Sequence, residues 1–442
     1  MFNHPIPVYV INLKHRTERK EYILQEFKNK KEFDVQIIEA CSHDIGPIGL
    51  WNSIKKVITI AQNRSADFIV VCEDDHQFTD DYSSEKLFNA IADAKKLNAD
   101  VLSGGVSWFT GTIQCTEHVY WMEMFSGTQF LIIFRNFFET MLNAGFNAGD
   151  DADYKICSLT DRRFFICPFI SVQKEFGYSD ATAKNNVEGR VEALFKKSCT
   201  TIDAIKDISE FYHNTLSLKE EVDLCEIGSY RIPTYIINLP ERTERRKHIE
   251  EQFRGKNEFD VSIIQACRHE VGAVGLWLSI RKVIEAAIVN DDDVIIICED
   301  DHEFTENYSK EILIRNIIEA HGQHVDYMSG GSGKFGLALP VSENRVWTNF
   351  CFSTQFIIIF KKFFQSILNE PFDDSVIGDK KLSEMTVNKM LFCPFISQQK
   401  DFGYSDVTPM HNENAGMLNF LFAKSTHRIN QIHNAYIMLF KK

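Results

Sequence analysis

One long repeat constrains this chain more than any other feature. The stretch DFIVVCEDDHQFTDDYS at 67–83 returns as DVIIICEDDHEFTENYS at 293–309. The offset between these copies is 226 positions, and the same offset separates further identical residues. Examples are Asn12 and Asn238, Cys41 and Cys267, Trp51 and Trp277, and Tyr178 and Tyr404. A constant offset over this length indicates duplication of a whole domain rather than of a short solenoid unit.

The repeat and the chain length together predict two domains. At 442 residues the chain is too long for one ordinary hydrophobic core. We expect one domain at 1–205 and a second at 232–442. The segment 206–231 has no counterpart in the repeat, and we interpret it as a helical connector. The weaker echoes LFKKSCTTIDAI and FLFAKSTHRINQI predict further helices, including one near the C-terminus.

Strand and helix patterns alternate within each copy. A strand, VYVINL or TYIINL, precedes a charged helix with apolar residues at helical spacing, and FDVQIIEA or FDVSIIQA gives the second strand. A glycine-containing turn and a helix then lead to the strand that ends in EDD. A later strand, FLIIF or FIIIF, runs into another helix. This order predicts an α/β fold with a mostly parallel, doubly wound sheet in each domain.

The composition narrows the class of protein. A net charge of −14 and a pI near 5.5 argue against broad binding to nucleic acid or to anionic membranes, because both need a basic face. The longest apolar runs are far shorter than the roughly 20 residues of a membrane span. The start of the chain lacks the pattern of a secretory signal. The 11 cysteines form no CxxC pair, which favours reduced thiols. We therefore expect a cytoplasmic protein without a transmembrane segment.

Three adjacent carboxylates end the repeated strand in each copy. They are Glu73, Asp74 and Asp75 in the first copy and Glu299, Asp300 and Asp301 in the second. Open α/β sheets bind ligands at the carboxyl ends of their strands, and a divalent cation is a common reason to tolerate crowded carboxylates. Residues two apart in a strand point the same way, so Glu73 and Asp75 can share one ligand while Asp74 faces elsewhere. A solvated acidic turn is the alternative, although the recurrence of the motif favours a site.

Other polar residues surround these acids in the sequence. His76 and His302 directly follow them, and they either join the metal or cap the next turn. Two arginines three positions apart follow the first strand of each copy, where the start of a helix also attracts anions. These are Arg16 and Arg19, then Arg242 and Arg245. They could hold a nucleotide phosphate or base, and the alternative is a surface pairing with Glu18 or Glu244.

Paired glycines end a later short strand in each copy. They are Gly104 and Gly105, then Gly330 and Gly331. Because glycine has no side chain, such a pair permits close approach of a ligand to the backbone. A tight turn is an equally good explanation.

In this order the motifs resemble glycosyltransferase family 25, the lipopolysaccharide-type and collagen-type sugar transferases. The resemblance covers most of each copy and includes the late PFIS…Q…GYSD block. It implies two tandem GT-A-like domains, a nucleotide-diphosphate sugar as donor, with UDP the expected nucleotide, and inversion at the anomeric carbon. It also implies Mn²⁺ or Mg²⁺, held by Asp75 and by Asp301. Residues with an implied role in donor binding are Asn12, Arg16, Glu73, Asp74, Asn238, Arg242, Glu299 and Asp300.

An inverting transfer also needs a general base beside the acceptor hydroxyl. The resemblance places it in the acidic segment after TQF, at Asp150, Asp151 or Asp153 in the first copy and at Asp379 in the second. His411 of the second copy matches the late metal-binding histidine of many GT-A enzymes. The first copy has Asn185 at that position.

Our leading hypothesis is a metal-dependent glycosyltransferase that acts on a glycan or another hydroxyl acceptor. A tandem nucleotide-sugar or glycan-binding scaffold, with one or both domains inactive, is one alternative. A metal-dependent phosphohydrolase that uses the same acids is another.

Overall fold

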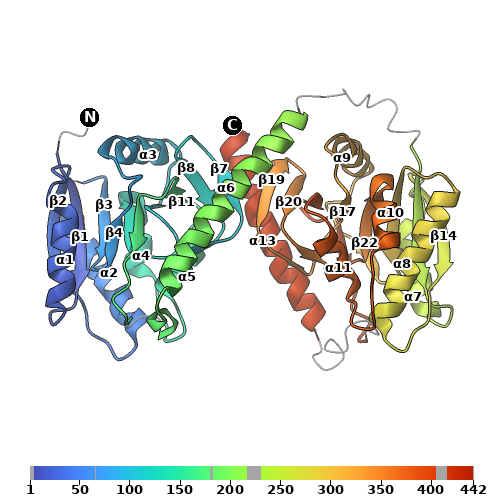
Figure 1. The fold of residues 1–442 in the computed structure, drawn as a ribbon, viewed down its shortest axis with the longest axis horizontal. Helices are drawn as coiled ribbons and strands as arrows, with labels where there is room; N and C mark the ends of the chain where they lie inside the picture. The colour runs from blue at the N-terminus through green and yellow to red at the C-terminus, as the bar shows by residue number, and fades with distance from the viewer. Residues whose placement is uncertain (1–3, 65, 180–182, 217–229, 405–415, 442) are drawn as a thin grey trace. The chain divides into compact units, whose positions relative to one another are not determined.

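The computed structural model describes residues 4–64, 66–179, 183–216, 230–404 and 416–441. The chain forms two compact units (Figure 1). Unit 1 comprises Met1–Lys206 with Met438–Lys442, and unit 2 comprises Asp207–Ile437. The division falls within the helix α6 (Arg190–Leu216). Of the predicted connector, residues 217–229 lie outside the described ranges.

Unit 1 is built on a mixed sheet of eight described strands. These are β1 (Ile6–Asn12), β2 (Phe33–Glu39), β3 (Phe68–Glu73), β5 (Val101–Ser103), β7 (Thr112–Gln114), β8 (Val119–Met122), β10 (Phe130–Phe134) and β11 (Arg163–Ile166). Their order in the sheet is β2-β1-β3-β10-β5-β11-β8-β7. β10 is antiparallel to both of its neighbours, and β8 is antiparallel to β11 and β7. Six of the eight strands therefore run in one direction.

Helices and two small ribbons complete unit 1. The helices are α1 (Thr17–Phe27), α2 (Gly46–Gln62), α3 (Ser84–Lys96), α4 (Phe138–Asn143), α5 (Ala152–Leu159) and most of α6, with short 3-10 turns at Arg135–Phe137 and Ala183–Asn186. One ribbon joins β4 (His76–Phe78) to β12 (Ser171–Gln173). The other joins β6 (Trp108–Phe109) to β9 (Phe125–Ser126).

Unit 2 has a sheet with the same strand order. Its strands are β13 (Ile232–Asn238), β14 (Phe259–Gln265), β15 (Val294–Glu299), β17 (Tyr327–Ser329), β19 (Ala338–Ser342), β20 (Arg345–Thr348), β22 (Phe356–Phe360) and β23 (Lys389–Phe392). They are arranged β14-β13-β15-β22-β17-β23-β20-β19, so each strand lies where its counterpart lies in unit 1.

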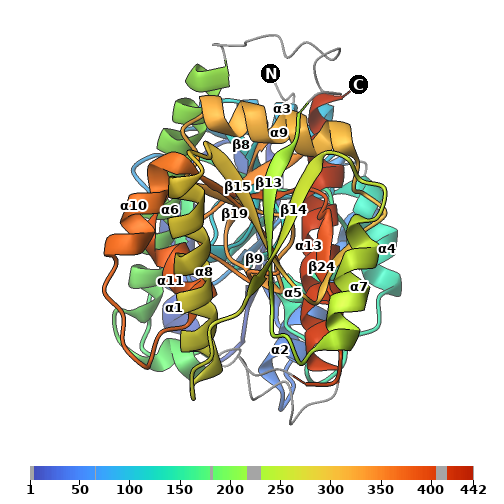
Figure 2. The same ribbon diagram turned by 90° about the vertical axis from the view of Figure 1, so that its right-hand side faces the viewer.

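The helices of unit 2 cover both faces of this sheet. They are α7 (Thr243–Phe253), α8 (Gly272–Val289), α9 (Lys310–Gly322), α10 (Lys361–Asn369), α11 (Gly378–Met385) and α13 (Met417–Phe440). Figure 2 shows α8, α10 and α11 on one face and α7 on the other. The ribbons pair β16 (His302–Phe304) with β24 (Ser397–Gln399), and β18 (Lys334–Phe335) with β21 (Cys351–Phe352).

The central strands are apolar because both of their faces are covered. In β3 every residue from Phe68 to Cys72 is buried, and β10 is buried throughout. Such continuous apolar runs are typical of strands between two helical layers. The predicted α/β class with a mostly parallel sheet is confirmed. The antiparallel β10 between β3 and β5 was not predicted, because an apolar run indicates burial but carries no information on strand direction.

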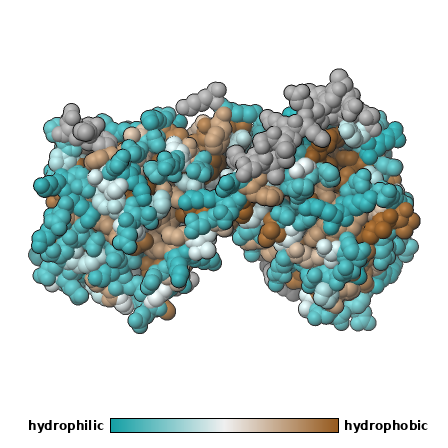
Figure 3. Space-filling model, turned by 45° about the horizontal axis from the view of Figure 1, so that its top comes forward, coloured by the Kyte–Doolittle hydropathy of each residue, from teal (hydrophilic) through white to brown (hydrophobic). Residues whose placement is uncertain are grey.

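In the described part of the chain, no helix is both long and apolar enough to cross a membrane. Figure 3 shows one face of the molecule, on which hydrophilic side chains predominate and apolar side chains form smaller patches.

The paired glycines at the end of β5 are explained by packing. A Cβ at Gly104 would lie 2.8 Å from the Phe130 ring and 2.9 Å from Cβ of Ser171, and one at Gly105 would overlap the carbonyl oxygen of Ser171. Gly331 of unit 2 meets the carbonyl oxygen of Ser397 in the same way. The glycines therefore let β12 or β24 pass directly over the strand end.

This packing predicts that Gly105→Ala destabilises unit 1. The backbone of β12 would have to move, and overpacking of this kind typically costs about 1–3 kcal/mol. Gly145→Ala is a matched control, because a Cβ there meets no atom within 4 Å. Chemical unfolding of the full chain measures both variants. Equal midpoints for Gly105→Ala and Gly145→Ala would contradict the packing explanation.

Candidate functional site

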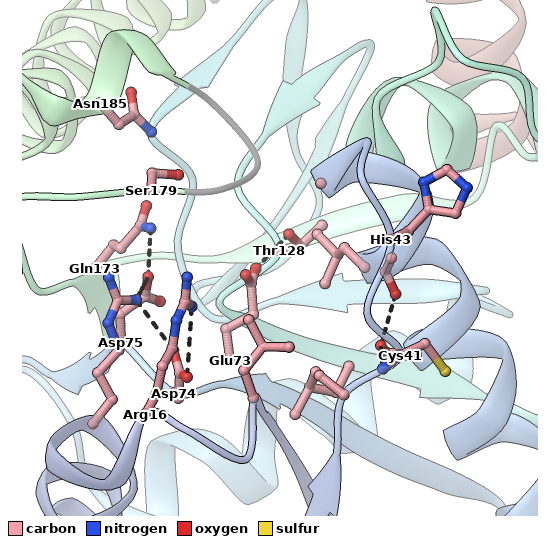
Figure 4. A pocket seen from close by; sticks show the side chains of 18 of the residues that line it. Arg16, Cys41, His43, Glu73, Asp74, Asp75, Thr128, Gln173, Ser179 and Asn185 are labelled. Carbon is pink, nitrogen blue, oxygen red and sulfur yellow. Dashed lines mark hydrogen bonds and ion pairs between the residues drawn. The ribbon is translucent and has the colours of Figure 1, made fainter.

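A cavity of about 460 Å³ opens at the carboxyl edge of the unit 1 sheet (Figure 4). The segments that follow β2, β1, β3 and β5 line it, together with the segment that precedes β10. These five strands are adjacent in the sheet, so the cavity runs along the strand ends. Ligands bind at this edge in open α/β sheets. The predicted residues Arg16, Arg19, Glu73, Asp74, Asp75 and Asp153 all line the cavity.

The carboxylate turn, Glu73–Asp75, is held by cationic and amide side chains. Asp74 is 4% exposed and accepts hydrogen bonds from Asn12 Nδ2 at 2.9 Å and from Arg19 Nη1 at 3.2 Å. Nη1 of Arg16 lies 3.8 Å from Asp74. The carboxylate of Asp74 is thus bound by side chains of the protein itself. Asn12 contacts the carboxylate turn through its hydrogen bond to Asp74.

Asp75 is buried but only partly satisfied. Its Oδ2 accepts from Gln173 Nε2 at 2.8 Å and from Arg19 Nη1 at 3.3 Å. Its Oδ1 is buried without a hydrogen-bond partner among the described residues. Burial and the neighbouring Asp74 raise the pKa of Asp75 above its ordinary value. An oxygen in this state would be stabilised by a cation or by a bound proton.

Glu73 has a different partner from Asp74. Its Oε1 accepts from the hydroxyl of Thr128 at 2.5 Å. Loss of hydration, followed by the charge of Asp75, raises the pKa of Glu73. Glu73 and Asp75 both line the cavity, and that they share one ligand stays a prediction.

Arg19 connects the carboxylate turn to a distant segment. Its guanidinium lies 4.6 Å from the ring centre of Phe176 and 4.3 Å from that of Tyr178, and its Nη2 donates to the Tyr178 carbonyl at 2.7 Å. The adjacent Asp74 and Asp75 outweigh the effect of burial and raise the pKa of Arg19. Arg19 is thus a fixed cation inside the site and not a surface arginine, and this contradicts the alternative of a pair with Glu18.

Unit 2 reproduces this arrangement almost atom for atom. Asp300 accepts from Asn238 at 2.8 Å and from Arg245 at 3.2 Å, and Asp301 accepts from Arg245 at 3.0 Å and from Gln399 at 2.9 Å. Arg242 lies 3.8 Å from Asp300. Glu299 accepts from Thr354 at 2.7 Å. Oδ1 of Asp301 again has no partner in the described part of the chain.

The structure separates the three predicted base residues of unit 1. Asp150 binds Lys155 and the backbone of Asn147 away from the cavity, and Asp151 is exposed at the start of α5. Asp153 lines the cavity, and its Oδ2 accepts from the N–H of Gly127 at 3.1 Å. Burial raises the pKa of Asp153.

Asp379 is the counterpart of Asp153 in unit 2. It accepts from the N–H of Ser353, and burial raises its pKa. Gly127 and Ser353 have φ angles of +121° and +124°, and only glycine adopts this region without strain. Both units therefore keep the same unusual backbone to present one N–H to the aspartate.

His76 does not have either of its predicted roles. Its Nδ1 lies 2.8 Å from the Ser171 hydroxyl, and its ring packs against Phe78 and Phe130. Burial lowers the pKa of His76, so the ring is a neutral core group that joins β4 to β12. His302 makes the same contact with Ser397.

The remaining predicted residues fall outside the cavity or outside the described ranges. None of Gly104, Gly105, Asp150 and Asp151 is among the described residues that line the unit 1 cavity. Gly330 and Gly331 pack against Ser397. His411 lies outside the described residues. Its counterpart Asn185 lines the cavity of unit 1.

The donor set fits a hard cation such as Mg²⁺ or Mn²⁺ only in part. Within the described ranges, no three His, Cys, Asp or Glu side chains come together as a ligand group. Mg²⁺ is, however, commonly held by one or two carboxylates with phosphate oxygens completing its shell. The unpartnered Oδ1 of Asp75 and the neighbouring Glu73 fit that smaller protein contribution.

Several site residues were missed by sequence reasoning. Thr128, Gln173, Phe176 and Tyr178 all contact the carboxylate turn or its arginine. Their signal was the repeat itself, since TQF, the late glutamine and FGYSD occur in both copies.

These contacts predict different roles for the two arginines of unit 1. Arg19→Ala leaves two buried carboxylates without their cation, and breaking a buried ion pair typically costs about 3–5 kcal/mol. Arg16→Ala should destabilise the chain less, because Nη1 of Arg16 lies 3.8 Å from Asp74 whereas Arg19 makes a 3.2 Å hydrogen bond to it and also contacts Asp75. Chemical unfolding measures both variants. A loss for Arg16→Ala as large as that for Arg19→Ala would contradict this division of roles.

Comparisons with known proteins find only weak structural similarity. The sequence matches no protein-family model and no curated protein. Among solved structures, an apo UDP-glucose pyrophosphorylase aligns with 44% of this chain and 82% of its own, at 11% identity and a TM-score of 0.27. HddC from Yersinia pseudotuberculosis aligns with 45% of this chain and 99% of its own, at 10% identity and a TM-score of 0.23. The mannosyltransferase PcManGT from Pyrobaculum calidifontis, in complex with GDP-Man and Mn²⁺, aligns with 55% of this chain and 79% of its own, at 12% identity and a TM-score of 0.22. Similarities this low assign no function to the chain.

Proposed function

We propose that the chain is a tandem, metal-dependent glycosyltransferase with one GT-A-like site in each unit. Each site would transfer a sugar from a nucleotide-diphosphate sugar, with UDP the expected nucleotide, to a hydroxyl of a glycan or another acceptor. The observation that carries the proposal is the carboxylate turn, in which one oxygen of the buried Asp75 has no hydrogen-bond partner among the described residues and which opens onto a cavity beside Arg16. The motif resemblance to glycosyltransferase family 25 supports the same assignment.

Mn²⁺ or Mg²⁺ would be held by Asp75 with Glu73, and by Asp301 with Glu299. When bound, the cation neutralises negative charge on a diphosphate leaving group. Arg16 lies on the same side and supplies a second positive charge toward the phosphates. Asp74 and Arg19 contact these groups and keep them in place, so both are positioning residues.

Asp153 is the residue best placed to act as general base. The acceptor hydroxyl oxygen forms the new bond to the anomeric carbon while the bond from that carbon to the diphosphate oxygen breaks. The hydroxyl proton passes to the carboxylate of Asp153, which the Gly127 N–H holds in position. A carboxylate whose pKa is raised accepts a proton more readily. Asp379 has the same role in unit 2.

A scaffold in which unit 2 binds ligands without transfer is the second candidate. One observation favours it, namely that Glu241 and Arg268 of unit 2 form a 2.7 Å ion pair. Their counterparts in unit 1, His15 and Ser42, line the cavity, so unit 2 has a charged pair where unit 1 has two cavity-lining residues. A phosphohydrolase would use the same acids but would need no acceptor.

The metal assignment predicts acceptor-dependent release of nucleotide that requires Mn²⁺ or Mg²⁺. Asp75→Ala should abolish this activity in unit 1, and Asp301→Ala should abolish it in unit 2, since each removes a ligand and its charge. A panel of nucleotide sugars, with and without acceptor and metal, measures the effect. Release that needs no acceptor would indicate the hydrolase. Binding without release would indicate the scaffold. A double variant that keeps its metal dependence would exclude the assigned site.

The base assignment predicts that Asp153→Asn and Asp151→Asn behave differently. In a chain that carries Asp301→Ala, Asp153→Asn should lower kcat by 10²-fold or more, because general-base catalysis contributes about 10²–10⁴-fold. Asp151→Asn should change kcat less than threefold, since Asp151 is exposed outside the cavity. Donor affinity should stay the same in both. The reverse order of effects would move the base to Asp151.

A further inference from the structure

The two units differ most at one end of their sites. Around the carboxylate turn, the arginines, acids, threonine and glutamine are identical in both copies. Beside the proposed base the character of the side chains changes. Trp108 and Tyr154 of unit 1 correspond, at the constant offset, to Lys334 and Lys380 of unit 2.

Trp108 faces the same side of its ribbon as a residue that lines the cavity. Trp108 lies opposite Ser126 across the β6–β9 pair, and directly opposed residues of antiparallel strands point to one face. Ser126 lines the cavity, as does Ser107, the residue before Trp108. Trp108 is therefore a neighbour, along the chain and across the ribbon, of residues that line the cavity, and we place it at the cavity rim on that ground.

Tyr154 completes an aromatic pair at this rim. It follows Asp153 on α5, and its ring lies 6.3 Å from that of Trp108 in an edge-to-face arrangement. Trp108 is 38% exposed and Tyr154 is 43% exposed, whereas the other four tryptophans are at most 7% exposed. Two contacting, partly exposed aromatic rings beside a polar cavity give a ligand an apolar surface next to polar groups.

The chemistry of this rim suits a neutral sugar. The flat face of a pyranose ring carries C–H groups that pack on an aromatic ring, while its hydroxyls point outward at the edge. Aromatic side chains provide a large, rigid apolar face for such packing. Ser107 and Ser126 line the cavity beside this pair; the Ser107 hydroxyl donates to the Ser126 carbonyl at 3.1 Å, and the Ser126 side chain forms a hydrogen bond with Asp153.

Two lysines stand at the corresponding positions of unit 2. Lys334 lies opposite Phe352 across the β18–β21 pair, with Nζ 5.8 Å from the Phe352 ring centre. Lys380 follows Asp379 on α11, and its side chain is 54% exposed. Its contact with Glu384, at 3.7 Å on one helix face, is weak enough to yield to a ligand. Two lysines at the positions of the aromatic pair give this part of unit 2 positive charge, which attracts an anionic ligand.

We propose that these positions form the acceptor subsites and that the two units take acceptors of different charge. Trp108 and Tyr154 stack on a neutral sugar in unit 1. Lys334 and Lys380 bind a sugar that carries a carboxylate or phosphate group in unit 2. The inference rests on the proposed function, because it names the substrate class of the same two sites.

The test is a reciprocal exchange in the full chain, probed with arrays of neutral oligosaccharides and of uronic-acid or phosphorylated oligosaccharides. Trp108→Lys with Tyr154→Lys should weaken binding of neutral glycans at least tenfold and keep binding of acidic glycans. Lys334→Trp with Lys380→Tyr should do the opposite. Tyr230→Lys is the matched control, because Tyr230 is 42% exposed and precedes β13, outside both rims.

Tryptophan fluorescence adds a readout that is specific for the rim. A neutral oligosaccharide should shift the emission of the natural chain, and the shift should vanish in Trp108→Phe, because the other tryptophans are buried. Equal thermal midpoints for the natural chain and the exchange variants would show that the variants are folded.

The outcomes separate this inference from the proposed activity. Glycan preferences that exchange as expected, in a chain that transfers no sugar from any donor, would overturn the transferase activity and keep the subsites. Sugar transfer with glycan preferences that ignore the exchange would overturn the subsites and keep the activity. If neither class of glycan bound the natural chain, the subsites would also be excluded.

Discussion

Crowding of three carboxylates, two of them buried, at the tip of one central strand is the constraint on which the rest of each site depends. Like charges this close repel, and a low-dielectric surrounding increases the cost. The three carboxylates are compensated by neighbouring groups to different degrees. Asp74 is neutralised by Arg19 and bonded by Asn12. One oxygen of Asp75 has no partner among the described residues, and Glu73 accepts from the hydroxyl of Thr128. The uneven compensation gives the turn one structural carboxylate and two that remain available for a ligand.

Arg19 connects the carboxylate turn to a segment that is distant in the sequence. It binds the turn with one nitrogen and the carbonyl of Tyr178 with another, and its planar face lies against two aromatic rings. A lysine could not make this set of contacts, because it has neither a second nitrogen nor a flat face. The segment that contains Gln173 and Tyr178 is thereby held over the acids from about one hundred positions further along the sequence. The separation explains why local sequence patterns alone do not place these residues in the site.

The residues at the centre of the site could be predicted from the sequence because they lie in short motifs that occur in both copies. The strand that ends in EDD and the helix start with two arginines both follow from local periodicity. Other features depend on packing between distant segments. The phase of α5 decides that Asp153, and not Asp151, faces the cavity, and no periodicity in DDAD predicts it. The glycines of SGG were open to two interpretations until the position of Ser171 showed what they accommodate.

The identical centres and the different rims have a common physical origin. A change at Asn12, Arg19, Asp74 or Gln173 breaks a buried network whose members depend on one another, so such a change costs stability as well as chemistry. A change at Trp108 or Tyr154 alters half-exposed side chains on a two-stranded ribbon and at a helix start, where substitutions cost little. Two copies of one fold can therefore diverge at the rim while the centre stays fixed. The lysines at these positions in unit 2 are a difference of this inexpensive kind. The two units thus have the same residues around the carboxylate turn and different residues beside it.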